Sequence, residues 1–239
     1  MIKIILIIIL LVVLFYFNNV ECFNNNKTNL KFIHIPKNAG TSIENLGKLY
    51  DYKWGRFDNI KVYKNSPCNY FIWHSPYIQK EKGYEYFAII RNPYDKIISE
   101  FYYVTSGKIK KGEYGNKKHI EIFYEWFNNI HNIYKTNKYW NNCHILPQSN
   151  YIFDKNGNKI VEHVIIMDKD FNKNLNILFN EKFNLGIDIN KFQKDNSTKK
   201  EFNKNDLNND IRKKIYKMYE QDFKNFGFNS LLFLRNTKC

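Results

Sequence analysis

Apolar and polar positions along the chain follow two periods, one typical of strands and one typical of helices. An apolar run at 31–35 is followed by a helical pattern at 41–49, and a strongly apolar run at 86–90 predicts another strand. Pro93 then suits the first turn of a helix in which apolar residues recur at helical spacing. This order of strand, helix, strand and helix predicts a three-layer α/β domain, with a central parallel sheet flanked by helices.

The same patterns predict further elements around this unit. A short strand is expected at 70–73. An extended segment from Tyr151 and an Asn-Gly turn at 156–157 should lead into a buried strand at 161–167. The Lys- and Gly-rich stretch 107–116 is typical of a loop. A second loop is expected at 190–205, and helices are predicted at 119–135, 171–183 and 207–226.

The N-terminus is almost continuously apolar through Phe17, and a polar, Asn-rich stretch follows. A membrane-spanning helix needs ~20 apolar residues, so a cleaved signal peptide is the alternative to a membrane anchor. We favour an uncleaved signal-anchor at 1–20, then a polar stem at 21–30 and one domain at 31–239. Lys3 would keep the N-terminus cytosolic and place the domain in the secretory lumen, as in a single-pass type II membrane protein. Cleavage would instead give a secreted protein.

Composition and charge narrow the classes of protein. The chain has 239 residues, of which 44% are hydrophobic and 18% aromatic, which excludes a disordered protein. Its formal net charge of +14 favours polyanionic partners such as nucleic acid, phosphonucleotides, anionic lipid or acidic polysaccharide. A compositional bias toward lysine, with the lysines solvating the surface, would give the same charge.

The cysteines show no CxxC spacing, so neither a zinc site nor thioredoxin-like chemistry is supported; they are Cys22, Cys68, Cys143 and Cys239. In an oxidising lumen Cys68 and Cys143 could form a disulfide, although the sequence does not establish the pairing. Asn26 and Asn196 begin glycosylation sequons, which agree weakly with a lumenal domain.

One short stretch, FIHIPKNAGTSIE at 32–44, has the features of an anion site. A strand, a glycine-bearing loop and a helix start bring unpaired backbone N–H groups together. Gly40 allows close approach of the backbone, Thr41 and Ser42 add hydroxyl donors, and Lys37 adds a positive charge. The stretch does not match the nucleoside-triphosphatase pattern GxxxxGK[ST], because the lysine precedes the turn. An ordinary capped helix start is the alternative.

A second candidate anion site follows the strand at 86–90. Arg91 lies at the end of that strand, and Ser99 lies about two turns into the next helix. A guanidinium and a hydroxyl in this arrangement can bind one phosphate together. Arginine is scarce in this lysine-rich chain, which favours a role for its fork geometry. A structural ion pair with Asp95 or Glu100 is the alternative.

Together, PKNAGTS (36–42) and RNPYDKIISEFYY (91–103) closely resemble the signatures of the Golgi-type carbohydrate sulfotransferases, including the 2-O and 6-O glycan enzymes and their bacterial and viral relatives. The likeness covers about residues 31–228. It implies a sulfotransferase fold like that of P-loop nucleoside triphosphatases, 3′-phosphoadenosine 5′-phosphosulfate (PAPS) as the sulfuryl donor, no metal, and a Golgi or secretory lumenal location. The sequence departs from the pattern at Asn38, where threonine is commoner, and at Lys96, where arginine is frequent.

The resemblance also implies roles for individual residues. Arg91 and Ser99 should bind the 3′-phosphate, and Lys37 should stabilise the leaving oxygen. His74, in a His-x-Pro segment, is implied as the general base, with a core histidine as the alternative. Glu44 is the other candidate base, by analogy with sulfotransferases that use a carboxylate. The loop around the 5′-phosphosulfate should comprise Lys37, Asn38, Ala39, Gly40, Thr41 and Ser42.

Other segments are less informative. His34 is predicted to be structural, and His144 to border the cleft. The lysine-rich run 108–118 is more typical of a solvated loop than of a glycan-binding surface. The stretches 144–152 and 219–228 resemble the family more loosely.

We therefore predict a membrane-anchored, PAPS-dependent sulfotransferase acting on a hydroxyl of an anionic glycan, with no nucleic acid as partner. One alternative is a P-loop-like nucleotide kinase, which the missing Walker lysine and the lack of a clear Mg²⁺-binding carboxylate oppose. The other is a non-catalytic protein that binds anionic glycan or nucleic acid through its basic surface. No heptad run or apolar stripe predicts an oligomer.

Overall fold

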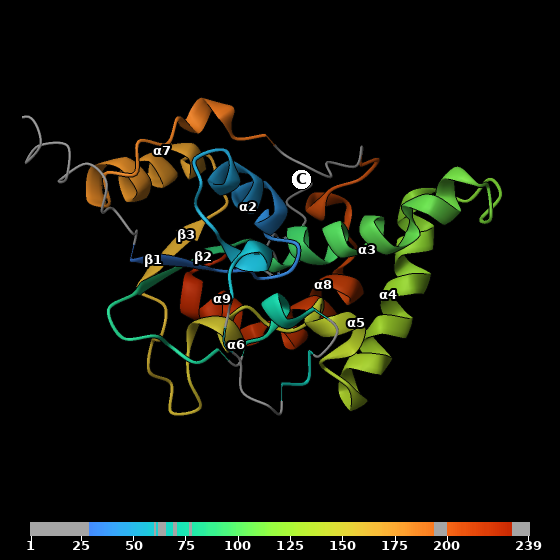
Figure 1. The fold of residues 1–239 in the computed structure, drawn as a ribbon. Coiled ribbons are helices and arrows are strands. Elements are labelled where there is room, and N and C mark those ends of the chain that lie inside the picture. Colours follow the sequence, from blue (N-terminus) through green and yellow to red (C-terminus); the bar gives the residue numbers. More distant parts are fainter. Residues whose placement is uncertain are drawn as a thin grey trace, which may run out of the picture.

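The fold is a small parallel sheet with helices on both faces (Figure 1). The computed structural model describes residues 29–59, 61, 66–68, 71–76, 78–193 and 200–230. Strands β1 (Leu30–Ile33), β2 (Glu85–Ile90) and β3 (His163–Ile166) lie side by side in this order, and both pairs are parallel. Helical segments connect them, as parallel neighbours require. The predicted three-layer α/β architecture is confirmed.

The central strand β2 is buried on both faces, and its side chains divide between two apolar clusters. Phe87 packs with residues of α2 (Gly40–Lys48) and α7 (Phe171–Asn176) on one side of the sheet. Ala88, the next residue, packs on the other side with residues of α6 (Ser149–Ile152). This division follows from the two-residue period of a strand, and it explains why β2 is apolar from Tyr86 to Ile90.

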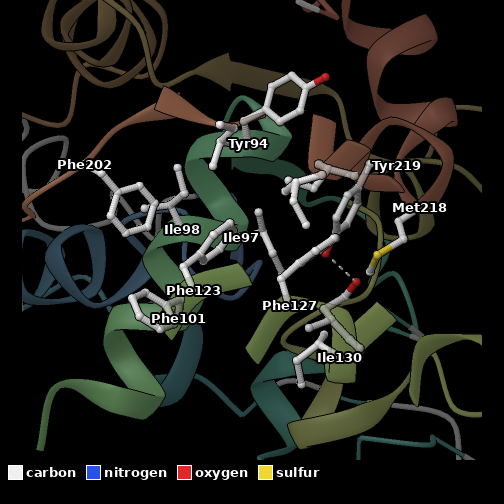
Figure 2. Close-up of a cluster of buried hydrophobic side chains, with 14 of the residues drawn as sticks. Tyr94, Ile97, Ile98, Phe101, Phe123, Phe127, Ile130, Phe202, Met218 and Tyr219 are labelled. Atoms are coloured by element: carbon white, nitrogen blue, oxygen red, sulfur yellow. Dashed lines mark hydrogen bonds between the residues drawn. The ribbon is translucent and has the colours of Figure 1, made fainter. Parts of the chain in front are cut away.

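A helical lobe packs beside the sheet and has its own apolar core. Phe123 lies at the centre of this core, with its ring centroid 5.4 Å from that of Phe101 and 5.2 Å from that of Phe202 (Figure 2). The apolar stripe of the sequence at 119–135 forms the side of the helix that faces this core. The lobe consists of α3 (Pro93–Lys110), α4 (His119–Thr136), α8 (Asn209–Met218) and α9 (Glu220–Phe226).

Several short turns complete the chain. They are the 3₁₀ turns Gly55–Phe57, Ile72–His74, Ile189–Lys191 and Lys204–Asp206, the π-helical turn Ile177–Lys182 and the short element α5 (Trp140–Cys143). Inside α5 the backbone is left-handed, with φ values of 49° at Asn141, 57° at Asn142 and 70° at Cys143. Left-handed residues other than glycine cost roughly 1–2 kcal/mol each, so other contacts must stabilise this turn.

The prediction of an extended conformation is wrong for two segments. The residues Ile72–His74 form a 3₁₀ turn, because no described strand lies beside the aromatic run and its rings contact one another instead. Residues 149–152 form the helical turn α6, which buries the Tyr151 ring, and the chain becomes extended only at Phe153, whose bridge to Lys159 closes the predicted Asn-Gly turn.

Two predicted helix boundaries also differ. Helix α3 continues to Lys110, into the stretch predicted to be a loop. The single helix predicted at 207–226 is broken at Tyr219, whose φ is −120°. The hydroxyl of Tyr219 donates to the carbonyl oxygen of Ile145 at 2.9 Å, and this buried contact fixes the break between α8 and α9.

A disulfide joins Cys68 to Cys143, across 75 residues of sequence, with their Cα atoms 5.7 Å apart. The pairing that the sequence left open is therefore formed. It ties the left-handed turn of α5 to the segment that precedes Ile72–His74.

The apolar segment 1–20, most of the stem at 21–30, Cys22, Cys239 and both sequons lie outside the described residues. Within the described part of the chain, no helix combines the length and apolar character that crossing a bilayer requires. The domain boundaries proposed from the sequence stay a prediction.

Replacing Phe123 by alanine should lower the free energy of unfolding by about 3–5 kcal/mol, because it leaves a cavity at the centre of the helical lobe. Denaturant unfolding followed by circular dichroism measures this change. The control is Ile177→Ala, whose side chain is 40% exposed and which should cost less than about 1 kcal/mol. A loss at Phe123 no larger than that of the control would contradict the packing described here.

Candidate active site

A cavity of about 770 Å³ opens at the carboxyl ends of the three strands. His34 lines it just after β1, Arg91 just after β2 and Met167 just after β3. Ligands of open α/β sheets collect at this edge, because the loops that leave the strands converge there. The cavity is therefore the candidate active site.

The structure brings nearly all of the predicted site residues to this cavity. His144 and both candidate bases, His74 and Glu44, also lie in its wall. Asn38 does not line it, because its side chain turns into the protein. The other predicted residues in the wall are Lys37, Ala39, Gly40, Thr41, Ser42, Arg91 and Ser99.

The loop between β1 and α2 has a tightly wound backbone. Lys37 and Ala39 are left-handed, with φ values of 68° and 61°. Alternating backbone handedness of this kind forms a concave nest of amide groups that favours anions. At the start of α2, the amide of Ile43 donates to the carbonyl oxygen of Ala39, so the amides of Gly40 and Thr41 precede the first helical hydrogen bond. This end of the helix is suited to a phosphate or sulfate group.

The side chain of Lys37 is half-buried and has no carboxylate partner among the described residues. Its ammonium lies 3.8 Å from the ring centroid of Tyr103, and no ion pair of Lys37 is found within the described residues. Burial lowers the pKa of Lys37 to about 8, although the charge of Glu100 opposes the shift. A desolvated cation in this position would be stabilised by a bound anion.

Arg91 is also available for an anion. Its guanidinium Nη1 donates to the carbonyl oxygen of Lys37 at 3.3 Å, which connects the two loops. The alternative ion pairs are absent from the described residues, since Asp95 pairs with Lys204 and Glu100 with His144. Burial lowers the pKa of Arg91, which shows that the guanidinium is partly desolvated.

One buried side chain, Gln148, connects both loops. Its Oε1 accepts hydrogen bonds from Asn38 Nδ2 at 2.6 Å and from the backbone amide of Arg91 at 2.7 Å. Its Nε2 donates to the carbonyl oxygen of Arg91 at 2.8 Å. Asn38 also donates to the carbonyl oxygen of Ile89, so it fixes the first loop to β2. Sequence reasoning missed Gln148, whose segment gave only a loose resemblance.

Asp222 of α9 fixes Gln148 in turn. Its Oδ2 accepts from the backbone amide of Gln148 at 2.9 Å, and its Oδ1 accepts from the amide and hydroxyl of Ser149 at 2.7 Å each. Burial raises the pKa of Asp222, although these donors oppose the shift. The C-terminal helix thus positions two loops near the start of the chain.

Three histidines lie in a row along the cavity wall. The ring centroid of His74 is 4.7 Å from that of His34 and 5.1 Å from that of His144. His34 Nδ1 lies 2.6 Å from Glu44 Oε1, and His144 Nδ1 lies 2.8 Å from Glu100 Oε2. His34, predicted to be structural, therefore belongs to the site. Within the described ranges, no group of three or more His, Cys, Asp or Glu side chains is arranged to hold a metal ion.

His74 is neutral at physiological pH. Burial, the nearby imidazoles of His34 and His144, and the positive charges of Lys37 and Lys96 all lower its pKa far below the usual range. Lys96 is fully buried, donates to the carbonyl oxygen of His144 at 2.5 Å, and does not line the cavity. A role for His74 as general base stays a prediction.

The sequence profile of the sulfotransferase family matches residues 21–229, which is most of the chain. The protein belongs to this sulfotransferase family, and its activity is the transfer of a sulfuryl group. The resemblance of the two motifs to sulfotransferases is thereby confirmed. Neither a curated protein nor a solved structure is significantly similar to the chain.

Replacing Gln148 by leucine should lower the free energy of unfolding by about 3 kcal/mol, because it leaves several buried donors without acceptors. It should also weaken binding of adenosine 3′,5′-bisphosphate, since the two loops lose their common contact. Denaturant unfolding and calorimetric titration measure the two effects. Gln193→Leu, at an exposed position, is the control. An unchanged bisphosphate affinity in a stably folded Gln148→Leu protein would refute the proposed coupling of the loops.

Affinity for adenosine 3′,5′-bisphosphate should fall as pH rises above about 8, the pKa of Lys37 in the free protein. The charged ammonium of Lys37 attracts the anion. The affinity for the bisphosphate therefore has its full value below that pKa and decreases above it. Titrations from about pH 6.5 to 9.5 measure this effect. Lys37→Arg, which stays charged, should bind evenly across the range. If the affinity of Lys37→Arg still decreases with pH, the titrating group is Lys96 and not Lys37, because burial also lowers the pKa of Lys96 to about 8.

Proposed function

We propose that this sulfotransferase takes the sulfuryl group from PAPS and transfers it to a hydroxyl of a carbohydrate. The observation that carries the proposal is the presence of two separate cationic groups, Lys37 and Arg91, in one cavity. PAPS has two anionic ends on one nucleoside, a 5′-phosphosulfate and a 3′-phosphate. Both cations are desolvated and neither has a carboxylate partner among the described residues, so the residues present fit this donor.

The two ends of the donor have suitable partners on different loops. Lys37 and the first amides of α2 would bind the 5′-phosphosulfate, and Arg91 with Ser99 would bind the 3′-phosphate. As the bond from sulfur to the phosphate oxygen breaks, negative charge develops on that oxygen, and Lys37 gains interaction with it. The acceptor hydroxyl must lose its proton to a base in the same cavity.

The rim of the cavity supports a sugar acceptor. Phe71 and Trp73 line it, with ring centroids 4.9 Å apart, and so does Tyr103, which is 54% exposed. Aromatic faces pack well against the apolar faces of sugar rings. Arg56 also lines the cavity, and the chain carries a net charge of +14, so we propose an anionic glycan as the acceptor.

We also propose that the protein works in the secretory lumen, anchored by the segment at 1–20. The disulfide between Cys68 and Cys143 supports an oxidising compartment, because such bonds persist there and are rare in the cytosol.

Calorimetric titration of the protein with adenosine 3′,5′-bisphosphate, ATP with Mg²⁺, and heparin tests the proposal. The bisphosphate should bind at micromolar level and more tightly than ATP. Tighter binding of ATP with Mg²⁺ would favour a nucleotide kinase, and binding of heparin alone would favour a non-catalytic glycan-binding protein. Transfer of ³⁵S from PAPS to de-O-sulfated heparin or chondroitin then tests the acceptor class.

Arg91→Ala should remove most of the preference for adenosine 3′,5′-bisphosphate over adenosine 5′-monophosphate. A hydrogen-bonded guanidinium and phosphate contribute roughly 1.5–3 kcal/mol, so the preference should fall by about 10- to 100-fold. Competition binding against a fluorescent nucleotide measures it. Arg212→Ala on α8, outside the cavity, should keep the parental preference. Retention of that preference by Arg91→Ala would exclude Arg91 from the 3′-phosphate site.

A further inference from the structure

We propose that His34, oriented by Glu44, is the general base that deprotonates the acceptor hydroxyl, and that His74 acts as a hydrogen-bond donor. The inference rests on the proposed function and assigns roles within the same cavity. The His-x-Pro segment of the sequence predicts His74 as the base instead. The assignment to His34 rests on the hydrogen bonds of the three imidazoles.

The hydrogen bond between His34 and Glu44 fixes the tautomer of His34. Glu44 Oε1 lies 2.6 Å from His34 Nδ1 and also accepts from the backbone amide of Arg56 at 2.9 Å. The Arg56 side chain adds a charge contact, with its Nε 3.2 Å from Glu44 Oε2. Both oxygens of Glu44 thus face donors of Arg56 and act as acceptors, so the proton between Glu44 and His34 is on His34 Nδ1. Nε2 of His34 therefore keeps a lone pair that can take a proton.

Glu44 cannot serve as the base directly. Its side chain is fully buried, and its carboxylate faces His34 and Arg56. It acts as a positioning residue, in the way that a buried carboxylate orients the histidine of a hydrolase triad.

Two glycines leave room for this pair. A Cβ atom on Gly40 would collide with the ring of His34, and a Cβ on Gly55 would collide with Glu44 Oε1. The glycine of the anion loop is thus needed for the imidazole beneath it. This contact also places His34 directly against the loop that would bind the sulfuryl group.

His74 has the opposite tautomer. The Asn142 Oδ1 accepts from the backbone amide of Phe71 at 3.3 Å, so the amide nitrogen of Asn142 faces His74 Nδ1, at 3.2 Å. An amide nitrogen only donates, so Nδ1 of His74 accepts and its proton is on Nε2. In this state His74 donates a hydrogen bond from Nε2 and has no free lone pair for a proton.

His144 shares the tautomer of His34 but lies elsewhere in the cavity. Its ring centroid is 5.4 Å from that of Tyr103, the ring that also contacts the Lys37 ammonium. In-line transfer requires the acceptor to attack from the side opposite the leaving oxygen, which Lys37 stabilises. His144 and the Lys37 ammonium thus contact the same ring, on the side of the leaving oxygen, so we assign the base to His34 and not to His144.

The proposed step transfers the sulfuryl group to the acceptor and the acceptor's proton to His34. The acceptor oxygen forms a bond to sulfur while its proton passes to Nε2 of His34. The bond from sulfur to the phosphate oxygen breaks, and its electron pair leaves with adenosine 3′,5′-bisphosphate beside Lys37. His74 donates from Nε2 to an oxygen of the transferring group. His34 then releases its proton to solvent.

Imidazole nitrogen NMR tests the tautomers without any substrate. Full-length protein in detergent micelles, labelled with ¹⁵N-histidine, gives separate signals for protonated and unprotonated ring nitrogens. His34→Gln and His74→Gln assign the two residues by loss of their signals. We expect an unprotonated Nε2 in His34 and an unprotonated Nδ1 in His74. An unprotonated Nε2 in His74 would overturn the inference.

Turnover of the same variants provides the second test, with bisphosphate binding as a check on folding. His34→Gln should lose ~10²-fold or more in ³⁵S transfer, the usual scale for a general base, with bisphosphate affinity unchanged. His74→Gln, whose amide can still donate, should stay within about 10-fold of the parent. Glu44→Gln should lose ³⁵S transfer to a similar extent as His34→Gln. Glu85→Gln, which alters the surface pair of Glu85 and His163 at the opposite edge of the sheet, should match the parent.

The outcomes separate this inference from the proposed function. A parent protein that does not bind adenosine 3′,5′-bisphosphate overturns both. A parent that binds it, with His74→Gln or His144→Gln inactive and His34→Gln active, overturns only the assignment of the base. Should His34→Gln fail to fold, the ring-nitrogen signals of His74, assigned through His74→Gln, still decide whether His74 has the tautomer that the inference requires.

Discussion

The amide of Gln148 holds together the two loops that carry Lys37 and Arg91. It accepts from the first loop through Asn38, forms hydrogen bonds in both directions with the backbone of Arg91, and is itself fixed by Asp222. A nucleotide with phosphates at both ends needs two anion sites at a set separation, and sheet geometry alone does not provide it. Each buried hydrogen bond adds only about 1 kcal/mol net, but an unpaired buried group costs more, so the whole network forms or fails together.

The positively charged groups around the cavity destabilise the folded protein when no anion is bound. Lys37 and Arg91 line the cavity and Lys96 is buried behind its wall, and burial lowers the pKa of all three positively charged groups. A bound polyanion relieves the desolvation and repulsion that these shifts report. Binding and folding are therefore thermodynamically linked, because a ligand that binds only the folded state raises its stability.

The sequence predicted the parts of the site that depend on local pattern. Strand ends fall at one edge of a parallel sheet, so the convergence of Lys37 and Arg91 followed from β1, β2 and their loops. Contacts between distant segments were not predictable, as the 74 residues between Gln148 and Asp222 illustrate. The aromatic run before His74 resembled a strand because its residues have high β propensity, which tertiary contacts overrode. The contact between His34 and Glu44 was also not predictable, because no spacing rule links a strand end to that position of the following helix.

The left-handed turn of α5 connects the histidine row to the disulfide. Asn141 donates to Glu100 at 2.7 Å and Asn142 to His74, whereas the next residue, Cys143, forms the disulfide. The disulfide closes a loop of 75 residues and contributes on the order of 4 kcal/mol, comparable to the cost of the turn. A chain folded under reducing conditions would lack that compensation, so the turn, and with it the position of His74, should be less stable when the two thiols are reduced.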